Sequence, residues 1–286
     1  MPPFAPDARH TAWSDPGPHR ARLGELPAVP AAIADALEEF VIHHAVARQL
    51  GFGVPEEAEA DRSLRRVSLL LDALLRRDDR HLSIHRALPN YLYVTCRDFA
   101  LLAIAALRER GVPARLRAGF ANYFGRGTWE DHYICEYRDG TAWAVLDAQL
   151  GPRARQGLGI GFDIAHVPAD GWRPAAAVWR AVRAGAMDPA LCGYASAGIA
   201  GEWWIASSVL RDAAALSGTE CLPWDDWGPA TEFRATRRVT EEQAQAIDTL
   251  AAALDPAPED RDAARALFAR FPWAAPRLVA WPPSFY

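Results

Sequence analysis

Hydrophobic residues recur along the chain with two different periods, and each period predicts one kind of element. A helical period runs from about Ala31 to Gly51, and a second runs through residues 55–78, with acidic residues early and arginines late, as the helix dipole favours. Residues 96–109 are apolar without a break from Phe99 to Leu107, which is typical of a helix buried on most sides. The first part of the chain therefore predicts two helices followed by a central one.

The central helix has clear start and stop signals. Thr95 is a good N-cap residue, and Asp98 three positions later completes a variant of the capping box. Gly111 and Pro113 follow the last apolar residue, and a glycine followed by a proline ends a helix. Cys96 is therefore expected to be the first residue of this helix.

The period changes from helical to alternating after Pro113, which predicts strands. Residues 114–124 have the pattern of a strand, and residues 132–148 have the pattern of a β-hairpin. Asp139-Gly140 is the dipeptide that two-residue hairpin turns favour most, so these residues are expected to form the turn.

The last part of the chain is expected to be mainly helical. Residues 151–188 show no clear period and are expected to be irregular, whereas helical patterns return at residues 201–216, 240–254 and 259–270. Thr240 and Gln243 form a further capping box. Helices, then a short antiparallel sheet, then helices predict an α+β fold, with a central helix packed on the sheet and helical extensions at both ends.

Three segments follow from this pattern. Residues 1–29, rich in proline and arginine, are expected to be extended. Residues 30–150 hold the expected core with its N-terminal helices, and residues 151–286 form a helical extension packed on that core. Oligomeric state leaves no mark in the sequence.

Composition excludes several classes of function. The chain is 50% hydrophobic and 23% charged, as folded globular proteins are, and its net charge of −5 without a basic segment argues against nucleic-acid partners. It contains no lysine, which excludes a Walker-type phosphate loop and Schiff-base or pyridoxal chemistry of the usual kind. No signal peptide or membrane-spanning run is present, so a soluble cytoplasmic protein with no membrane partner is expected.

The cysteines do not form a metal or disulfide pattern. Cys96, Cys135, Cys192 and Cys221 are widely spaced, with no C-x-x-C pair, so free thiols and no metal site are expected.

The hairpin predicts a polar pair. With Asp139 and Gly140 as the turn residues, His132 and Asp147 are equally far from the turn and therefore lie opposite each other, with side chains on one face. Cys135 points to the other face and cannot be the thiol that His132 activates. The same register pairs Ile134 with Val145 and Glu136 with Trp143.

Cys96 is the thiol that this histidine could activate. A helix N-terminus stabilises a thiolate, and its unbonded N–H groups can bind an oxyanion. Cysteine, histidine and aspartate in these positions have the roles of an acyl-transfer triad, as nucleophile, base and orienting group. Cys96 alone would be read as an inert buried thiol; its coincidence with His132 and Asp147 favours the triad.

The blocks "CRDFALLAIAALRERGVPARLRAGFANYF" and "DHYICEYRDGTAWAVLDAQ" resemble the transglutaminase-like superfamily over about Tyr91 to Leu150. The resemblance implies a papain-like α+β core and acyl chemistry at Cys96, His132 and Asp147, with no metal or organic cofactor. It does not imply protein cross-linking, because the flanking regions are not those of the large calcium-dependent enzymes.

The resemblance also suggests an oxyanion donor. Papain-like enzymes use a side chain shortly before the cysteine, and Asn90, six residues upstream of Cys96, has a suitable amide. The alternative is that Asn90 is only a turn residue, since asparagine is common in turns.

The expected function is cysteine-dependent hydrolysis or acyl transfer on an acyl donor: a peptide, an amide or a thioester. The acceptor is water or an amine. The alternatives are an amide-forming acyltransferase that uses a thioester on a carrier protein, and a non-catalytic binding module on the same fold. The binding module predicts an ordinary thiol at Cys96.

Four other motifs in the sequence bear on its function. His81 and His85 have the spacing of a helical face but are expected to be exposed, and the adjacent His43 and His44 are expected to point apart on a helix and to be structural. The tryptophans of residues 203–204 and 224–227 could line a cleft, although packing in the core is favoured. The glycines of the loop Gly125–Asp131 would permit motion as a lid.

Overall fold

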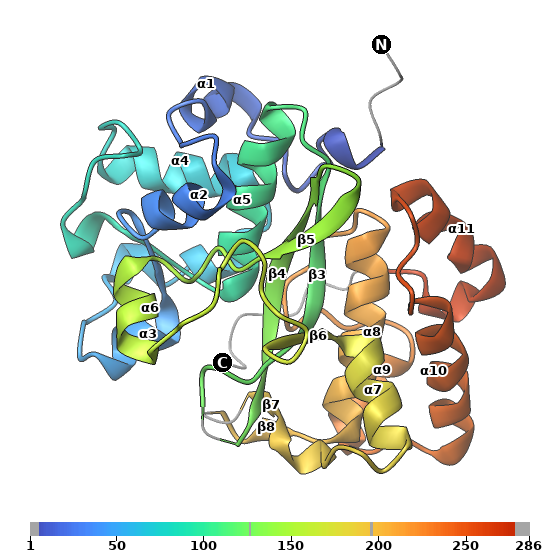
Figure 1. Ribbon diagram of the computed structural model, residues 1–286. Helices are drawn as coiled ribbons and strands as arrows, with labels where there is room; N and C mark the ends of the chain where they lie inside the picture. Colours follow the sequence, from blue (N-terminus) through green and yellow to red (C-terminus); the bar gives the residue numbers. More distant parts are fainter. Residues whose placement is uncertain (1–5, 126, 195–196, 278–286) are drawn as a thin grey trace. The chain divides into compact units, whose positions relative to one another are not determined.

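The computed structural model describes residues 6–125, 127–194 and 197–277 (Figure 1). The chain forms two compact units, and each is discontinuous in sequence. The described residues of the first unit are 6–115 and 134–167, and those of the second are 116–125, 127–133, 168–194 and 197–277. The boundary expected near residue 150 falls inside the first unit.

The first unit is built around one buried helix. Helix α5 (Cys96–Glu109) packs against α1 (Arg20–Leu23), α2 (Pro30–Leu37) and α4 (Val67–Arg77), which lie beside it in Figure 1. Every residue from Cys96 to Arg108 is buried, which confirms the prediction from its continuous apolar run.

A strand interrupts the first predicted helix. Helix α2 ends at Leu37, and β1 (Val41–His43) pairs in parallel with β2 (Leu92–Val94) before α3 (His44–Gln49) begins. The prediction of one helix from Ala31 to Gly51 was therefore wrong. The β-branched Val41 and Ile42 suit a strand, and pairing with a distant segment overrides the local helical period.

The second predicted helix begins later than expected. Only Val67–Arg77 is α-helical, whereas Glu56–Ala58 and Asp61–Ser63 form 3₁₀ turns. Leu64 and Arg66 are extended, with ψ of 127° and 144°, and they separate these turns from α4. The Asp61 carboxylate binds this segment to distant groups, because it accepts two hydrogen bonds from Arg77, at 2.6 and 2.7 Å, and one from the backbone N–H of Tyr93 at 3.1 Å.

The N-terminal segment is not extended over its described residues 6–29, contrary to expectation. It forms 3₁₀ turns at Pro6–Ala8 and Gly17–His19 and then α1. Helix α5 anchors it, because the Arg108 guanidinium donates to the carbonyl of Asp7 at 3.2 Å and to Ser14 Oγ at 2.7 Å.

Within the described residues, the larger sheet has six strands and is mixed rather than antiparallel. Its hydrogen-bonded order is β6-β3-β4-β7-β8, with β5 beside β4. Strand β4 pairs in parallel with β7, so the antiparallel sheet expected from the hairpin pattern is only part of it. Strands β7 and β8 are too short to show a period in the sequence. The bounds are β3 Ala114–Ala121, β4 Trp129–Asp139, β5 Ala142–Leu146, β6 Trp172–Pro174, β7 Cys192–Tyr194 and β8 Ile199–Ala200.

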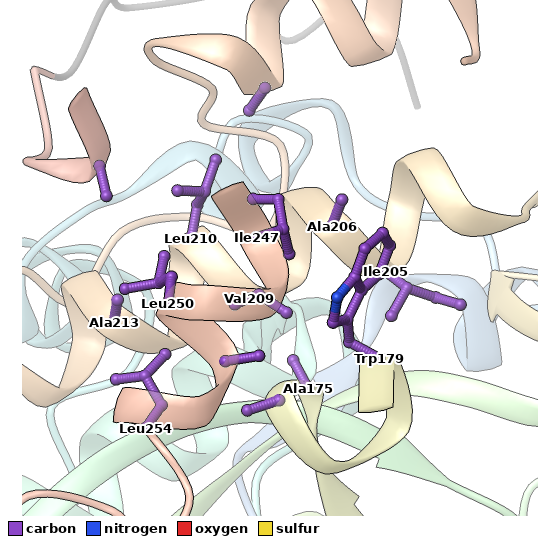
Figure 2. Close-up of a cluster of buried hydrophobic side chains, with 14 of the residues drawn as sticks. Ala175, Trp179, Ile205, Ala206, Val209, Leu210, Ala213, Ile247, Leu250 and Leu254 are labelled. Atoms are coloured by element: carbon purple, nitrogen blue, oxygen red, sulfur yellow. The ribbon is translucent and has the colours of Figure 1, made fainter. Parts of the chain in front are cut away.

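The second unit is mainly helical and has its own hydrophobic core. Helix α8 (Glu202–Leu216) packs against four helices, and Figure 2 shows Val209 and Leu210 of α8 among side chains of its neighbours. These neighbours are α7 (Ala175–Arg183), α9 (Pro229–Thr236), α10 (Glu241–Ala253) and α11 (Arg261–Arg270). Trp203, Trp204 and Trp227 belong to this core, which agrees with the interpretation as packing residues.

The helical predictions for the C-terminal half hold in part. Helices α8, α10 and α11 match the predicted segments, and Thr240 and Gln243 form the expected capping box. Residues 151–188 are not irregular, because they contain α6 (Pro152–Leu158), β6 and α7. Helix α7 has a clear helical period that the sequence analysis missed, because Ala175, Trp179 and Val182 recur at helical spacing and are buried. No helix in the described parts of the chain is long and apolar enough to cross a bilayer.

A buried ion pair joins β3 to α8 within the second unit. Asp212 accepts hydrogen bonds at 2.9 Å from Arg117 Nε, from Arg117 Nη2 and from the backbone N–H of Ala118. The Asp212 side chain is wholly buried and that of Arg117 is 3% exposed. A pair this deep costs much free energy when one charge is removed.

Asp212→Asn is therefore expected to lower the free energy of unfolding by about 3–5 kcal/mol, because the buried guanidinium of Arg117 then loses the carboxylate that accepts two of its hydrogen bonds. Urea denaturation measures the change. Glu59→Gln, which breaks the exposed Arg48–Glu59 pair, is the control and should cost less than about 1 kcal/mol. Equal losses in the two variants would contradict this account.

Candidate functional site

Cys96 is the first residue of α5, as the sequence predicts. Thr95 is the N-cap, and its backbone N–H and its hydroxyl both donate to Asp98 Oδ2 at 3.0 Å. The N–H of Asp98 in turn donates to the Thr95 carbonyl at 3.0 Å. The Cys96 side chain lies where the free N–H groups of the helix begin, and the residue is 8% exposed.

The other end of α5 also follows the prediction. Gly111 has a φ of 72° and donates to the Arg108 carbonyl, and Val112 donates to the Leu107 carbonyl. These two bonds form a Schellman motif, for which glycine is favoured because it adopts a positive φ without strain. Both ends of the helix are thus fixed by local interactions.

Arg97 and Asp98 form a buried ion pair in the first turn of α5. Arg97 donates to Asp98 Oδ1 at 2.7 Å and to the Arg65 carbonyl at 2.7 Å, and neither side chain of the pair is exposed. Burial raises the pKa of Asp98, while the Arg97 guanidinium and the Thr95 hydrogen bonds oppose that rise. The Arg97 guanidinium therefore balances the charge of the Asp98 carboxylate in the first turn of the helix that begins at Cys96.

The hairpin register differs from the prediction by two residues. The turn residues are Gly140 and Thr141, so Asp139 pairs with Ala142 and Cys135 pairs with Leu146. Gly140 has a φ of 58° whereas the φ of Thr141 is not positive, as in a type II′ turn with glycine first. The prediction that His132 lies directly opposite Asp147 was therefore wrong. So were the predicted pairs, since Glu136 faces Val145 and Arg138 faces Trp143.

Asp147 directly follows β5 and is wholly buried. Its Oδ1 accepts a hydrogen bond from the N–H of Gln149 at 3.0 Å, and its own N–H donates to the Ile164 carbonyl at 2.9 Å. These bonds form an Asx turn, which fixes the direction of the carboxylate.

His132 lies on β4 and is 2% exposed. Two aromatic rings of the segment after β3 meet its imidazole edge to face, Phe124 with centroids 4.7 Å apart and Tyr123 at 6.2 Å. Burial raises the pKa of the neighbouring Asp131 carboxyl to about 6, while the Arg211 guanidinium opposes the rise.

Cys96 and Asp147 belong to the first unit, and His132 belongs to the second. The grouping of the three as a triad therefore stays a prediction.

Asn90, the predicted oxyanion donor, ends a 3₁₀ turn, and its side-chain amide donates to Asp78 Oδ2 at 3.4 Å. It lines a shallow depression of about 450 Å³, whose other lining residues are Leu75, Arg76, Arg77, Asp78, Asp79 and Arg80. Its role toward an oxyanion also stays a prediction.

The loop expected at residues 125–131 ends earlier than predicted, because β4 begins at Trp129. Residue 126 lies outside the described residues. Gly127 has a φ of 78°, which a glycine adopts without strain. A role of this loop as a lid stays a prediction.

The adjacent histidines His43 and His44 do not point apart on a helix, as the sequence analysis expected. His43 ends β1, caps α3 and stacks on His44 with ring centroids 5.1 Å apart. The buried His44 lies beside Val94, whose carbonyl is 3.3 Å from its Nδ1, and Val94 leads into Cys96. The parallel pairing of β1 with β2 that creates this contact has no local signal in the sequence.

His81 and His85 are exposed, as expected, and do not lie on a helix. Their rings bond Ser83 and Glu39 respectively. Among the described residues, no group of three or more His, Cys, Asp or Glu side chains could hold a metal ion. All four cysteines are buried thiols.

No protein-family model, no curated protein and no solved structure matches the chain.

His44 makes the first unit sensitive to acid. Burial, with Arg62 in second place, lowers the pKa of His44 from 6.5 to about 4. Between these values the unfolded chain binds a proton that the folded chain does not, so stability falls as the pH falls through this window. The loss attributable to His44 is up to about 3 kcal/mol.

His44→Asn keeps an amide donor for the Val94 carbonyl and removes the titration. Urea denaturation at pH 7 and pH 4.5 should show a smaller acid-induced loss in this variant than in the wild type. His81→Asn, at an exposed position, should retain the wild-type loss. An unchanged acid-induced loss in His44→Asn would show that His44 is not its source.

Proposed function

We propose that the chain is a cysteine-dependent acyl-transfer enzyme with a papain-like, transglutaminase-like core, in which Cys96 is the nucleophile, His132 the base and Asp147 its orienting group. The observation that supports this most is the position of Cys96. Its thiol begins a buried helix capped at both ends, and the residue retains an exposed fraction of 8%. The other three cysteines are wholly buried.

The start of α5 suits a thiol nucleophile. The partial positive charge of a helix N-terminus favours a thiolate, and the backbone N–H of Cys96 can donate to an oxyanion that forms on the attacked carbonyl. The ion pair of Arg97 with Asp98 offsets the carboxylate that would otherwise disfavour a second negative charge.

The observed hairpin still supports a pairing of His132 with Asp147. Side chains alternate along a strand, so His132 shares a face of the continuous strand β4 with Glu136. Glu136 faces Val145, and Asp147 follows Val145 by two residues. The observed register differs from the predicted one by two residues. A shift by an even number of residues leaves each side chain on the face that was predicted for it.

In the proposed reaction, the Cys96 thiolate attacks the carbonyl carbon of an amide, ester or thioester. His132 donates a proton to the leaving group, and a thioester to Cys96 remains. His132 then takes a proton from the acceptor, which attacks the thioester and releases the acyl group and Cys96. Water as acceptor gives hydrolysis. An amine as acceptor gives amide formation, and in that case the acyl donor can be a thioester on a carrier protein. These steps use no metal or organic cofactor.

Alkylation of the native protein with iodoacetamide should modify Cys96 first. Cys135 is wholly buried, lies opposite Leu146 and has its Sγ 3.7 Å from the Glu136 carbonyl, so it should react slowly. Cys96→Ala should abolish the fast modification, whereas Cys135→Ala should leave it intact, as read by intact-mass spectrometry. Fast modification that survives Cys96→Ala and is lost in Cys135→Ala would overturn the assignment.

Replacing Asp147 tests the orienting role. Asp147→Asn should lower the rate of single-turnover acylation by an activated ester by about 10²-fold, since general acid–base catalysis contributes at least this much. Asp163→Asn, an exposed carboxylate of the same unit, should leave the rate unchanged. Trapping the thioester with hydroxylamine and comparing its release by water identifies the acceptor. Equal rates in the two variants would remove Asp147 from the mechanism.

A further inference from the structure

An indole from another strand bonds the backbone of His132. Trp172 Nε1 donates to the His132 carbonyl at 3.2 Å, and the Trp172 residue is 4% exposed. Trp172 begins β6 and lies opposite Ala121 of β3, and β3 separates β6 from β4 in the sheet order. The indole therefore extends from β6 over the face of β3 to reach β4. All of these residues belong to the second unit.

Gly119 provides the room that this crossing needs. It shares a face of β3 with Ala121, because the two are separated by two residues. A Cβ on Gly119 would lie 2.4 Å from Trp172 Cζ2 and 2.2 Å from the Arg173 carbonyl oxygen, which are impossible contacts. Gly119 does not have a positive φ, so its glycine is explained by the close approach of β6, through the Arg173 carbonyl and the Trp172 indole, and not by backbone conformation.

The backbone around Trp172 is itself anchored to the segment that holds the imidazole. The N–H groups of Gly171 and Trp172 both donate to the Pro168 carbonyl, at 2.9 and 3.1 Å. Asn122 donates through its backbone to Gly171 at 3.0 Å and through its side chain to Asp170 at 2.6 Å. Tyr123 and Phe124, whose rings contact the His132 imidazole, directly follow Asn122 in the chain. One connected set of contacts thus touches His132 at its carbonyl and at its ring.

We propose that Trp172 is a positioning residue for His132: its indole, lying over Gly119, holds the backbone at His132 and thereby keeps the imidazole in one orientation against Phe124. This inference rests on the proposed role of His132 as the base. A strand residue whose carbonyl and ring are both held has little freedom to rotate, which is what a general base requires.

The test compares two tryptophans that make the same kind of bond. Trp172→Phe keeps an aromatic ring and removes the N–H donor. Trp227→Phe does the same at a buried indole that donates to the Ala274 carbonyl at 2.9 Å, so it controls for the loss of one such bond in the same unit. Ring resonances of His132, assigned by their absence in His132→Gln, are followed by NMR over a pH titration.

In Trp172→Phe, the His132 titration midpoint should shift by up to about 0.5 pH unit, because the imidazole is no longer held in one orientation; the energy of one neutral hydrogen bond sets this upper limit. The rate of Cys96 alkylation near neutral pH should fall about fivefold. Trp227→Phe should leave both unchanged at a similar loss of stability. A His132 midpoint in Trp172→Phe equal to that of the wild type would overturn the proposal.

A measurement on the wild type keeps the proposal testable even if Trp172→Phe does not fold. The indole N–H of Trp172, assigned by its nuclear Overhauser contacts to Gly119, should exchange slowly with solvent and should shift with the midpoint of the His132 ring. Fast exchange without such a shift would overturn the proposal.

The two proposals fail in different ways. If His132→Gln leaves Cys96 alkylation unchanged, His132 is not the base, and the proposed function fails. The coupling between the Trp172 indole and the His132 ring is measured without Cys96, so its failure removes only the positioning role of Trp172.

Discussion

The buried carboxylate of Asp98 fixes the point at which α5 begins, and the proposed chemistry depends on that point. It accepts hydrogen bonds from the backbone and the hydroxyl of Thr95 and from the guanidinium of Arg97. Because all of these groups are buried, each would cost free energy if its partner were lost, so the helix has one favourable starting residue. That starting residue leaves Cys96 at position N1, where the backbone N–H groups are unbonded. A start one turn earlier or later would place the thiol in the bonded interior of the helix or outside it.

Arginine–carboxylate pairs recur in the cores of both units, in a chain that has no lysine. The first unit buries Arg97 with Asp98 and Arg115 with Glu136, and the second buries Arg117 with Asp212 and Arg211 with Asp226. The planar guanidinium can donate to a carboxylate and to backbone carbonyls at the same time, which an ammonium does less well. Removing one charge from such a buried pair is far more costly than forming the pair is favourable. They fix the first turn of α5 and β3, the elements next to the proposed nucleophile and base.

Local signals in the sequence were read correctly where the interaction itself is local. The caps of α5 and α10 are such cases, because the donor and acceptor lie within three residues of each other. Predictions failed where pairing with a distant segment determines the local structure. Val41–His43 is a strand only because Leu92–Val94 pairs with it, and the Trp172 bond to His132 exists only because β6 pairs with β3. The hairpin lies between these cases: its strands were predicted, but the turn uses Gly140-Thr141 in place of Asp139-Gly140. The two-residue shift removes the predicted direct pairing of His132 with Asp147.

The central claim is that the thiol of Cys96 and the imidazole of His132 meet in the folded protein. A short bifunctional reagent such as a dihaloacetone joins a thiol to an imidazole only when the two are nearly in contact. Cleavage after arginine then separates Cys96, in residues 87–97, from His132, in residues 127–138. The account predicts that mass spectrometry finds these two peptides joined through Cys96 and His132, and that prior alkylation of Cys96 abolishes the product. A bridge from His132 to Cys135 within a single peptide, with Cys96 modified alone, would contradict it.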